Sequence, residues 1–229
     1  MKYLLAIAIE DYSDPKLGRI PFALNDAIAL GEALQGHGYD TDRQYVMLNE
    51  DATKTAVESR LKRLATLLTE DDQIAVYYAG HGCSISGRSV ITARDSQFAD
   101  LESTTISLAD IFDTLGGSAC RRVMMFLDAR HGGIGSDLAD DELTEFFDRS
   151  AHCACFAACQ SGESSHSSGQ LQHGVWAWHL LEALRGDAPL ALGPGNRLTA
   201  ASLQNFLVTE VHRTLQTTFK DNHSQTPWM

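Results

Sequence analysis

The chain has 229 residues, of which 44% are hydrophobic, and it carries a formal net charge of −12 at pH 7. This length and composition allow one substantial core, so we expect a single domain. The acidic balance argues against nucleic acid and anionic membrane surfaces as partners, because both need clustered Lys and Arg to displace counterions.

Short β-branched runs alternate with longer helical patterns along the chain. The helical spacing defines two apolar faces: Ala23, Ala27, Leu30 and Leu34, followed by Gly36 and Gly38, and then Val57, Leu61, Leu64 and Leu68 after the cap candidate Thr53. We expect strands at residues 4–9, 44–48, 74–78, 122–127 and 153–158. This alternation indicates parallel βαβ units with helices on both faces of a sheet, and a Ser-Gly-Arg turn predicts a hairpin over residues 84–94.

Two stretches interrupt this pattern and are predicted to be loops. Residues 132–148 are glycine-rich and then acidic, and residues 160–172 are crowded with Ser, Gly and His. The five cysteines do not suggest a disulfide framework, and neither a run of 18 apolar residues nor a signal-peptide cleavage pattern is visible. We therefore expect a soluble, cytoplasmic protein.

Two of the predicted strands run into polar, glycine-rich turns. One segment reads Gln73-Ile-Ala-Val-Tyr-Tyr-Ala-Gly-His81-Gly82, and the other continues from an apolar run at residues 123–127 into Asp128-Ala-Arg130-His131-Gly-Gly133. Ligand and catalytic groups gather at the carboxyl ends of strands in an open parallel sheet, so we expect the two turns to lie side by side. A His on one turn and a Cys on the other would form a cysteine-protease dyad.

Together these two motifs resemble the caspase and metacaspase family of cysteine peptidases, peptidase C14. The similarity extends to the opening strand, to Asn25-Asp26 at a helix start, and to His173-Gly174-Val175-Trp176 before a closing helix. The resemblance implies a three-layer αβα sandwich of caspase type, with a mainly parallel six-stranded sheet and helices on both faces. It also implies one caspase-like domain over residues 1–229, with a p20-like part at about 1–140 and a p10-like part at about 150–229.

The family writes its second motif as Asp-x-Cys-His-x-Gly, and position 130, where the nucleophilic Cys is expected, is Arg. By resemblance, His81 is the catalytic base, and the backbone N–H groups of Gly82 and of residue 130 form the oxyanion hole. A lone His is more often structural, so the motif is what favours catalysis for His81. Arg130 cannot attack a carbonyl carbon, because its guanidinium stays protonated and offers only donors.

The other cysteines and histidines do not supply the missing chemistry. Cys83 lies on the turn of His81 itself and would approach from an unsuitable direction, while Cys120, Cys153, Cys155 and Cys159 are interpreted as buried hydrophobic residues near strands. The Cys spacing lacks the Cys-x2-Cys pattern of structural zinc sites. Leu108-Ala109 stands where calcium-dependent relatives place acids, so we expect no metal and no cofactor.

Two acids suggest the substrate preference. Metacaspases, which cleave after Arg or Lys, carry acids at positions that match Asp26 and Asp128, although Asp26 could equally serve as ordinary helix N-terminal charge. We expect the Arg130 guanidinium to fold into this acidic pocket and imitate a bound P1 Arg. Arg149, in the acidic loop, is the candidate processing site.

Three functions remain open from the sequence. The first is a pseudopeptidase that binds a basic peptide or regulates a protein partner in a death, immunity or stress pathway. The second is an active endopeptidase cleaving after Arg or Lys, seen here with its nucleophile substituted. The third is a small-molecule sensor, for which no Gly-x-Gly-x-x-Gly or P-loop pattern follows any strand.

Overall fold

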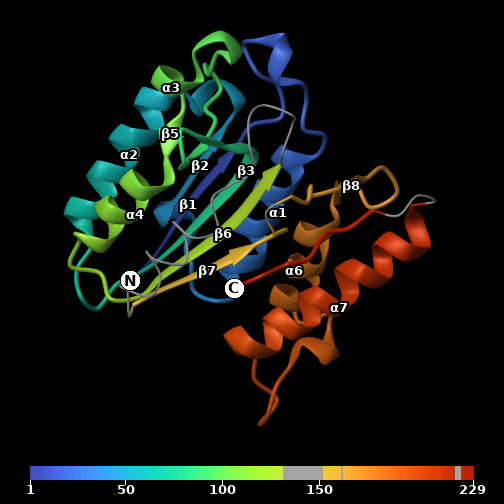
Figure 1. Cartoon of the computed structure of the whole chain (residues 1–229). Helices are drawn as coiled ribbons and strands as arrows, with labels where there is room; N and C mark the ends of the chain where they lie inside the picture. The colour runs from blue at the N-terminus through green and yellow to red at the C-terminus, as the bar shows by residue number, and fades with distance from the viewer. Residues whose placement is uncertain (131–151, 161, 220–222) are drawn as a thin grey trace.

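The computed structural model describes residues 1–130, 152–160, 162–219 and 223–229, in which a mixed sheet lies between two helical layers (Figure 1). The sheet strands are β1 (Lys2–Ala8), β2 (Gln44–Leu48), β3 (Gln73–Ile85), β4 (Arg88–Ile91), β5 (Ile106–Ser107), β6 (Val123–Arg130) and β7 (Cys153–Ala157). The helices are α1 (Ala23–Gln35), α2 (Lys54–Leu67), α3 (Leu101–Thr104), α4 (Leu108–Gly116), α6 (Val175–Arg185) and α7 (Ala200–Thr218). A separate pair, β8 (Ser167–Ser168) and β9 (His173–Gly174), lies in the segment between β7 and α6.

The middle of the sheet is parallel, in the order β2-β1-β3-β6-β7. Strand β3 continues past its parallel partners into an antiparallel hairpin with β4, and β5 pairs with β4. The positive φ angles of Ser86 and Gly87 allow this tight turn. All five predicted strands and the hairpin are confirmed; the described sheet has seven strands rather than six, because β4 and β5 join it.

Helices cover both faces of the sheet, which confirms the three-layer sandwich. Helices α2 and α4 pack on one face, and α1, α6 and α7 lie on the other (Figure 1). The two predicted helices near the start of the chain are α1 and α2, and the Thr53 side chain accepts a hydrogen bond from the Ala56 N–H at 3.4 Å. The helix expected after Trp176 is α6, but it does not close the fold, since α7 follows it.

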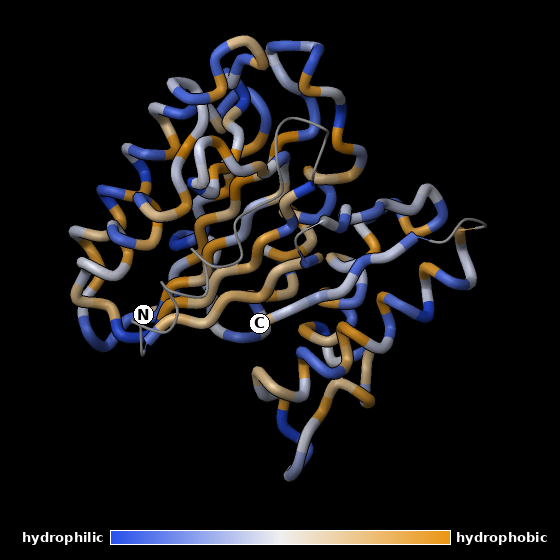
Figure 2. Tube along the Cα trace, viewed as in Figure 1, coloured by the Kyte–Doolittle hydropathy of each residue, from blue (hydrophilic) through white to orange (hydrophobic). Residues whose placement is uncertain are grey.

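The parallel strands are apolar on both faces, as the unbroken hydrophobic runs in Figure 2 show. Leu4 and Ala6 of β1 pack toward α1 and α6, whereas Leu5 and Ile7 pack toward α2 and α4. This alternation follows from the two-residue period of a strand, and burial of both faces explains why the runs do not alternate with polar residues.

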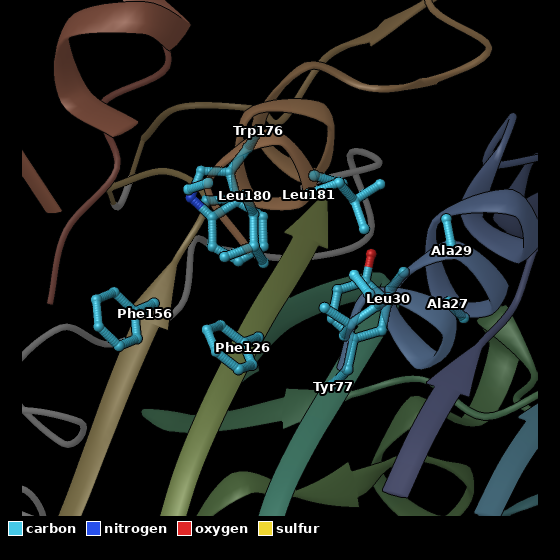
Figure 3. Close-up of a cluster of buried hydrophobic side chains, with 14 of the residues drawn as sticks. Ala27, Ala29, Leu30, Tyr77, Phe126, Phe156, Trp176, Leu180 and Leu181 are labelled. Carbon is cyan, nitrogen blue, oxygen red and sulfur yellow. The ribbon is translucent and has the colours of Figure 1, made fainter. Parts of the chain in front are cut away.

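Aromatic rings fill the core beneath α6. Figure 3 shows Tyr77 of β3, Phe126 of β6 and Phe156 of β7 on one face of the sheet, under Trp176 of α6. The rings of Phe126 and Phe156 stack with centroids 5.5 Å apart. Such rings each bury a large apolar area and fix the spacing between sheet and helix.

No described helix combines the length and the apolar character needed to cross a membrane.

Candidate active site

His81 and Arg130 lie opposite one another where the parallel pairing of β3 with β6 ends. The parallel register pairs His81 with Arg130, and the His81 Nδ1 atom lies 3.3 Å from the Arg130 carbonyl oxygen. This is the placement expected from the two motifs, because neighbouring parallel strands bring their last residues to the same edge.

The His81 imidazole is enclosed and held by its neighbours. His81 is 6% exposed, and the centroid of its ring lies 5.2 Å from that of the Tyr12 ring. The Tyr12 hydroxyl accepts the His81 backbone N–H at 2.9 Å, and the Tyr78 hydroxyl donates to the His81 carbonyl at 2.7 Å. Burial lowers the pKa of His81, so the ring is neutral at physiological pH and keeps one nitrogen as an acceptor. Its Nε2 atom is buried without a hydrogen-bond partner.

The backbone N–H of Gly82 faces the position occupied by residue 130. Thr92 donates its N–H to the His81 carbonyl at 3.0 Å, so the polar backbone groups of His81 point toward β4. Successive residues of a strand direct their N–H and C=O groups to opposite sides. Gly82 therefore points its N–H toward β6, with which β3 is paired as far as His81 and Arg130.

Asp26 and Asp128 converge on Gly174 from two sides. A Cβ atom placed on Gly174 would lie 3.1 Å from one carboxylate oxygen of each acid. Asp26, on α1, accepts from the Gly174 N–H at 3.0 Å and lies 2.6 Å from the His173 Nδ1 atom. The two acids are 1% and 2% exposed, respectively, so a glycine at position 174 is what lets both approach one point.

Burial changes the ionisation of both acids. It raises the pKa of Asp26 to about 6, against the hydrogen bond with His173, and the nearby charge of Asp128 raises that pKa further. Burial also raises the pKa of Asp128, while the Arg130 charge and a hydrogen bond with the Ser165 side chain lower it. The Asp128 Oδ1 atom and the hydroxyl of neighbouring Tyr77 are buried without a hydrogen-bond partner. The pocket thus holds polar atoms that a ligand could satisfy.

The Arg130 guanidinium binds a hydroxyl group of β8. Its Nη1 atom donates to the Ser167 hydroxyl at 3.0 Å, and it forms an ion pair with neither Asp26 nor Asp128. Its charge still lowers the pKa of Asp128, so it acts on that acid through space. The plug of the acidic pocket by Arg130 stays a prediction.

The described cysteines do not provide a nucleophile beside His81. Burial raises the pKa of Cys83 to about 11 and that of Cys155 to about 12, and it raises the pKa of Cys159. Their thiols therefore stay protonated, and a protonated thiol is a weak nucleophile. Within residues 1–130, 152–160, 162–219 and 223–229, no cluster of three His, Cys, Asp or Glu side chains could hold a metal ion.

Several residues of this site carried no role in the sequence analysis. Tyr12, Ser165 and Ser167 contact the base, the acid and the cation, respectively, and Gly174 separates the two acids. Tyr12 follows the carboxyl end of β1, so the strand-end rule could have placed it at the same edge. The candidate processing residue Arg149 lies outside the described residues.

Comparisons with known proteins agree with this architecture. The family model of the caspase domain, peptidase C14, matches residues 1–229. The crystal structure of protein GSU0716 from Geobacter sulfurreducens is similar in fold, with a TM-score of 0.68 and 16% identity, covering 99% of this chain and 91% of that chain. No curated protein matches the chain. The chain belongs to the peptidase C14 family of caspase domains.

Proposed function

We propose that this caspase domain binds peptides with Arg or Lys at P1 and does not hydrolyse them. Two features found together support this proposal. Two buried acids form a pocket, and Arg130 stands opposite His81, where a nucleophile would be needed. Asp26 and Asp128 form the pocket, His81 is the retained base, and Gly82 is the retained oxyanion donor.

The electrostatics of the pocket support a cationic ligand. Two carboxylates converge within a buried space, and the charge of Asp128 contributes to the raised pKa of Asp26. A guanidinium or ammonium group would relieve this repulsion and could supply the donor that Asp128 Oδ1 lacks. An acidic P1 side chain would add a third negative charge and is expected to be rejected.

The absence of hydrolysis follows from the side chain of Arg130. A guanidinium is protonated throughout the physiological range and has no lone pair for attack on a carbonyl carbon. Of the described cysteines, Cys83 is the nearest along the chain to His81, and burial keeps it as the thiol. In this proposal the domain holds a basic peptide or a protein partner without cleaving it. The proposed setting is the cytoplasm, within a death, immunity or stress pathway.

The same site also supports an active ancestor or parent protein. The pairing of His81 with Arg130 supports this second function, because it puts the base beside the position where Cys would stand. If Cys is restored, we expect cleavage after Arg or Lys, with processing at Arg149 between the p20-like and p10-like parts. Mass spectrometry of Arg130→Cys would locate the cut, and cuts confined to other residues would exclude Arg149.

Equilibrium binding of labelled peptides tests the proposal on the chain as it stands. Fluorescence polarisation would compare three peptides that differ only in a P1 Arg, Lys or Asp. We expect binding of the first two, no binding of the third, and at least tenfold weaker binding of the Arg peptide by Asp128→Asn, since a charge-assisted bond is lost. Equal affinities for all three peptides would contradict a basic P1 preference.

A further inference from the structure

Strand β3 changes its neighbour at His81. On one edge, β1 runs beside β3 only as far as the pair formed by Ala8 and Ala79. The chain then turns away, because the Glu10 N–H is donated to the Asn49 side chain at 2.9 Å. Strand β4 takes over on the edge that β1 leaves, and its pairing with β3 begins one residue after His81. The buried His81 N–H therefore lies at the change from one partner strand to the next, where it needs another acceptor.

The hydroxyl of Tyr12 provides that acceptor, in the segment that follows β1. It accepts the His81 N–H at 2.9 Å, and it lies 2.7 Å from the Thr92 hydroxyl. The Thr92 hydroxyl in turn donates to the His81 carbonyl at 3.1 Å. Each hydroxyl has one proton, so Tyr12 must donate to Thr92, whose own proton goes to the carbonyl. These bonds form a closed hydrogen-bond cycle that begins and ends at His81.

The surroundings of the cycle fix it further. Thr92 is 1% exposed, and the His81 carbonyl also accepts from the Thr92 N–H at 3.0 Å and from the Tyr78 hydroxyl at 2.7 Å. Gly80 leaves the room that the two phenols need, since a Cβ atom there would lie 3.0 Å from the Tyr12 hydroxyl and overlap that of Tyr78. Buried, fully satisfied polar groups of this kind hold one arrangement.

Tyr12 restrains the side chain of His81 as well as its backbone. The two rings are tilted by 31°, with centroids 5.2 Å apart. The imidazole Nδ1 atom lies 3.3 Å from the Arg130 carbonyl oxygen, so the ring is held beside the residue that replaces the nucleophile. A general base acts only within hydrogen-bond reach of the proton that it removes, and small displacements lower the rate strongly.

We propose that Tyr12 and Thr92 are positioning residues, whose linked hydroxyl groups hold His81 in the place of a general base beside position 130. This inference rests on the part of the proposed function in which His81 is the retained base, and it does not depend on the preference for a basic P1 residue. Tyr12 and Thr92 act through His81 and are not assigned a contact with the peptide.

The titration of His81 in the chain as it stands reports on this support. Burial lowers the pKa of His81 below the ordinary value of 6.5, against hydrogen bonds with backbone carbonyl groups, and the charge of Arg130 lowers it further. Burial raises the pKa of Tyr12 to about 12, so the phenol stays neutral during the titration. If the imidazole is released, water reaches it and its pKa rises toward 6.5. NMR of histidine-labelled protein would follow this signal, which His81→Gln identifies by its loss.

Four substitutions separate the hydroxyl groups from general packing. Tyr12→Phe keeps the ring and removes the hydroxyl, and Thr92→Val keeps the branched shape and removes the hydroxyl. Thr92→Ser keeps the hydroxyl. Tyr3→Phe is the matched control, because it removes a phenol hydroxyl that lies 3.7 Å from the Met1 sulfur near the amino end of β1. We expect a raised pKa of His81 in Tyr12→Phe and Thr92→Val, and the wild-type titration in Thr92→Ser and Tyr3→Phe.

Thermal unfolding of each variant is measured alongside, because a loss of stability alone does not move the titration of a folded protein. A wild-type titration of His81 in Tyr12→Phe or in Thr92→Val would overturn the proposal. An equal rise in Thr92→Ser or in Tyr3→Phe would also overturn it, since general loosening and not the hydrogen-bond cycle would then explain the change.

The same substitutions in the Arg130→Cys background separate this inference from the proposed function. There we expect Tyr12→Phe to lower kcat roughly tenfold and to leave KM within about twofold, because a displaced base slows the chemical step without weakening binding. Full kcat in that variant would leave the proposed function standing and show the role of Tyr12 to be wrong. If Arg130→Cys cleaves no peptide, the retained peptidase site is wrong, and the titration in the chain as it stands still decides whether Tyr12 and Thr92 hold His81.

Discussion

The middle and the carboxyl end of the same two strands differ in what their side chains achieve. In the middle of β3 and β6, residues such as Val76 and Phe126 are apolar, buried and packed against helices. A few residues further on, His81, Asp128 and Arg130 each hold a buried polar atom without a hydrogen-bond partner. Such atoms cost stability unless a ligand satisfies them, so one end of the strands stabilises the fold and the other carries polar atoms that a ligand could satisfy.

The largest effect is expected from removing an aromatic ring in the middle region. Phe126→Ala deletes a ring that is 2% exposed and stacked on Phe156. The lost burial and the resulting cavity should lower the free energy of unfolding by roughly 3–5 kcal/mol, measured by urea denaturation. A loss below about 1 kcal/mol would mean that this region does not carry the stability assigned to it.

At the carboxyl end of the strands, we expect a substitution to raise the free energy of unfolding instead of lowering it. Burial raises the pKa of Asp128, so its ionisation opposes folding above that pKa, and its contribution to stability is lost as pH rises. Asp128→Asn should therefore increase the free energy of unfolding at pH 8 by about 1–3 kcal/mol, with the gain shrinking toward pH 4. Asp187→Asn, at an exposed position after α6, is the control that should change neither value.

Asp26 provides an independent test of whether a buried carboxyl group lowers stability as the pH rises. Its pKa of about 6, against an ordinary value of 3.8, means that the folded state holds a proton more tightly than the unfolded state between these values. Stability should therefore fall as pH rises from 4 to 7, and this part of the fall should vanish in Asp26→Asn. A wild-type stability that rises steadily over this range would contradict a buried acidic pair.

The smallest effect is expected at Gly174, where a substitution by Ala changes shape and leaves the charge unchanged. A Cβ atom in Gly174→Ala would lie 3.1 Å from an oxygen of each acid, so both carboxylates must move by a few tenths of an ångström. We expect a loss of about 1 kcal/mol in stability and a severalfold loss in affinity for an Arg-P1 peptide. Unchanged affinity, measured by fluorescence polarisation, would show that the two acids do not act at this point.

The sequence was sufficient to predict those parts of the fold and the site that depend on local pattern and on the order of the strands. Apolar runs identified the parallel strands, and the strand-end rule brought His81 beside Arg130. It was insufficient where contacts join distant segments: Ser167 binds Arg130 from 37 residues away, and Gln225 binds Ser165 from 60. The contact of Arg130 with the Ser167 hydroxyl of β8 was not predicted, because no spacing rule reveals such a partner.

The central claim is that this caspase domain retains a peptidase site that lacks only its nucleophile. The most direct test is hydrolysis of fluorogenic peptides ending in Arg, Lys or Asp by the chain as it stands, by Arg130→Cys, and by Arg130→Cys with His81→Ala. We predict no cleavage by the first, cleavage after Arg and Lys but not Asp by the second, and no cleavage by the third. Cleavage by the unmodified chain, or by Arg130→Cys in the absence of His81, would contradict the account.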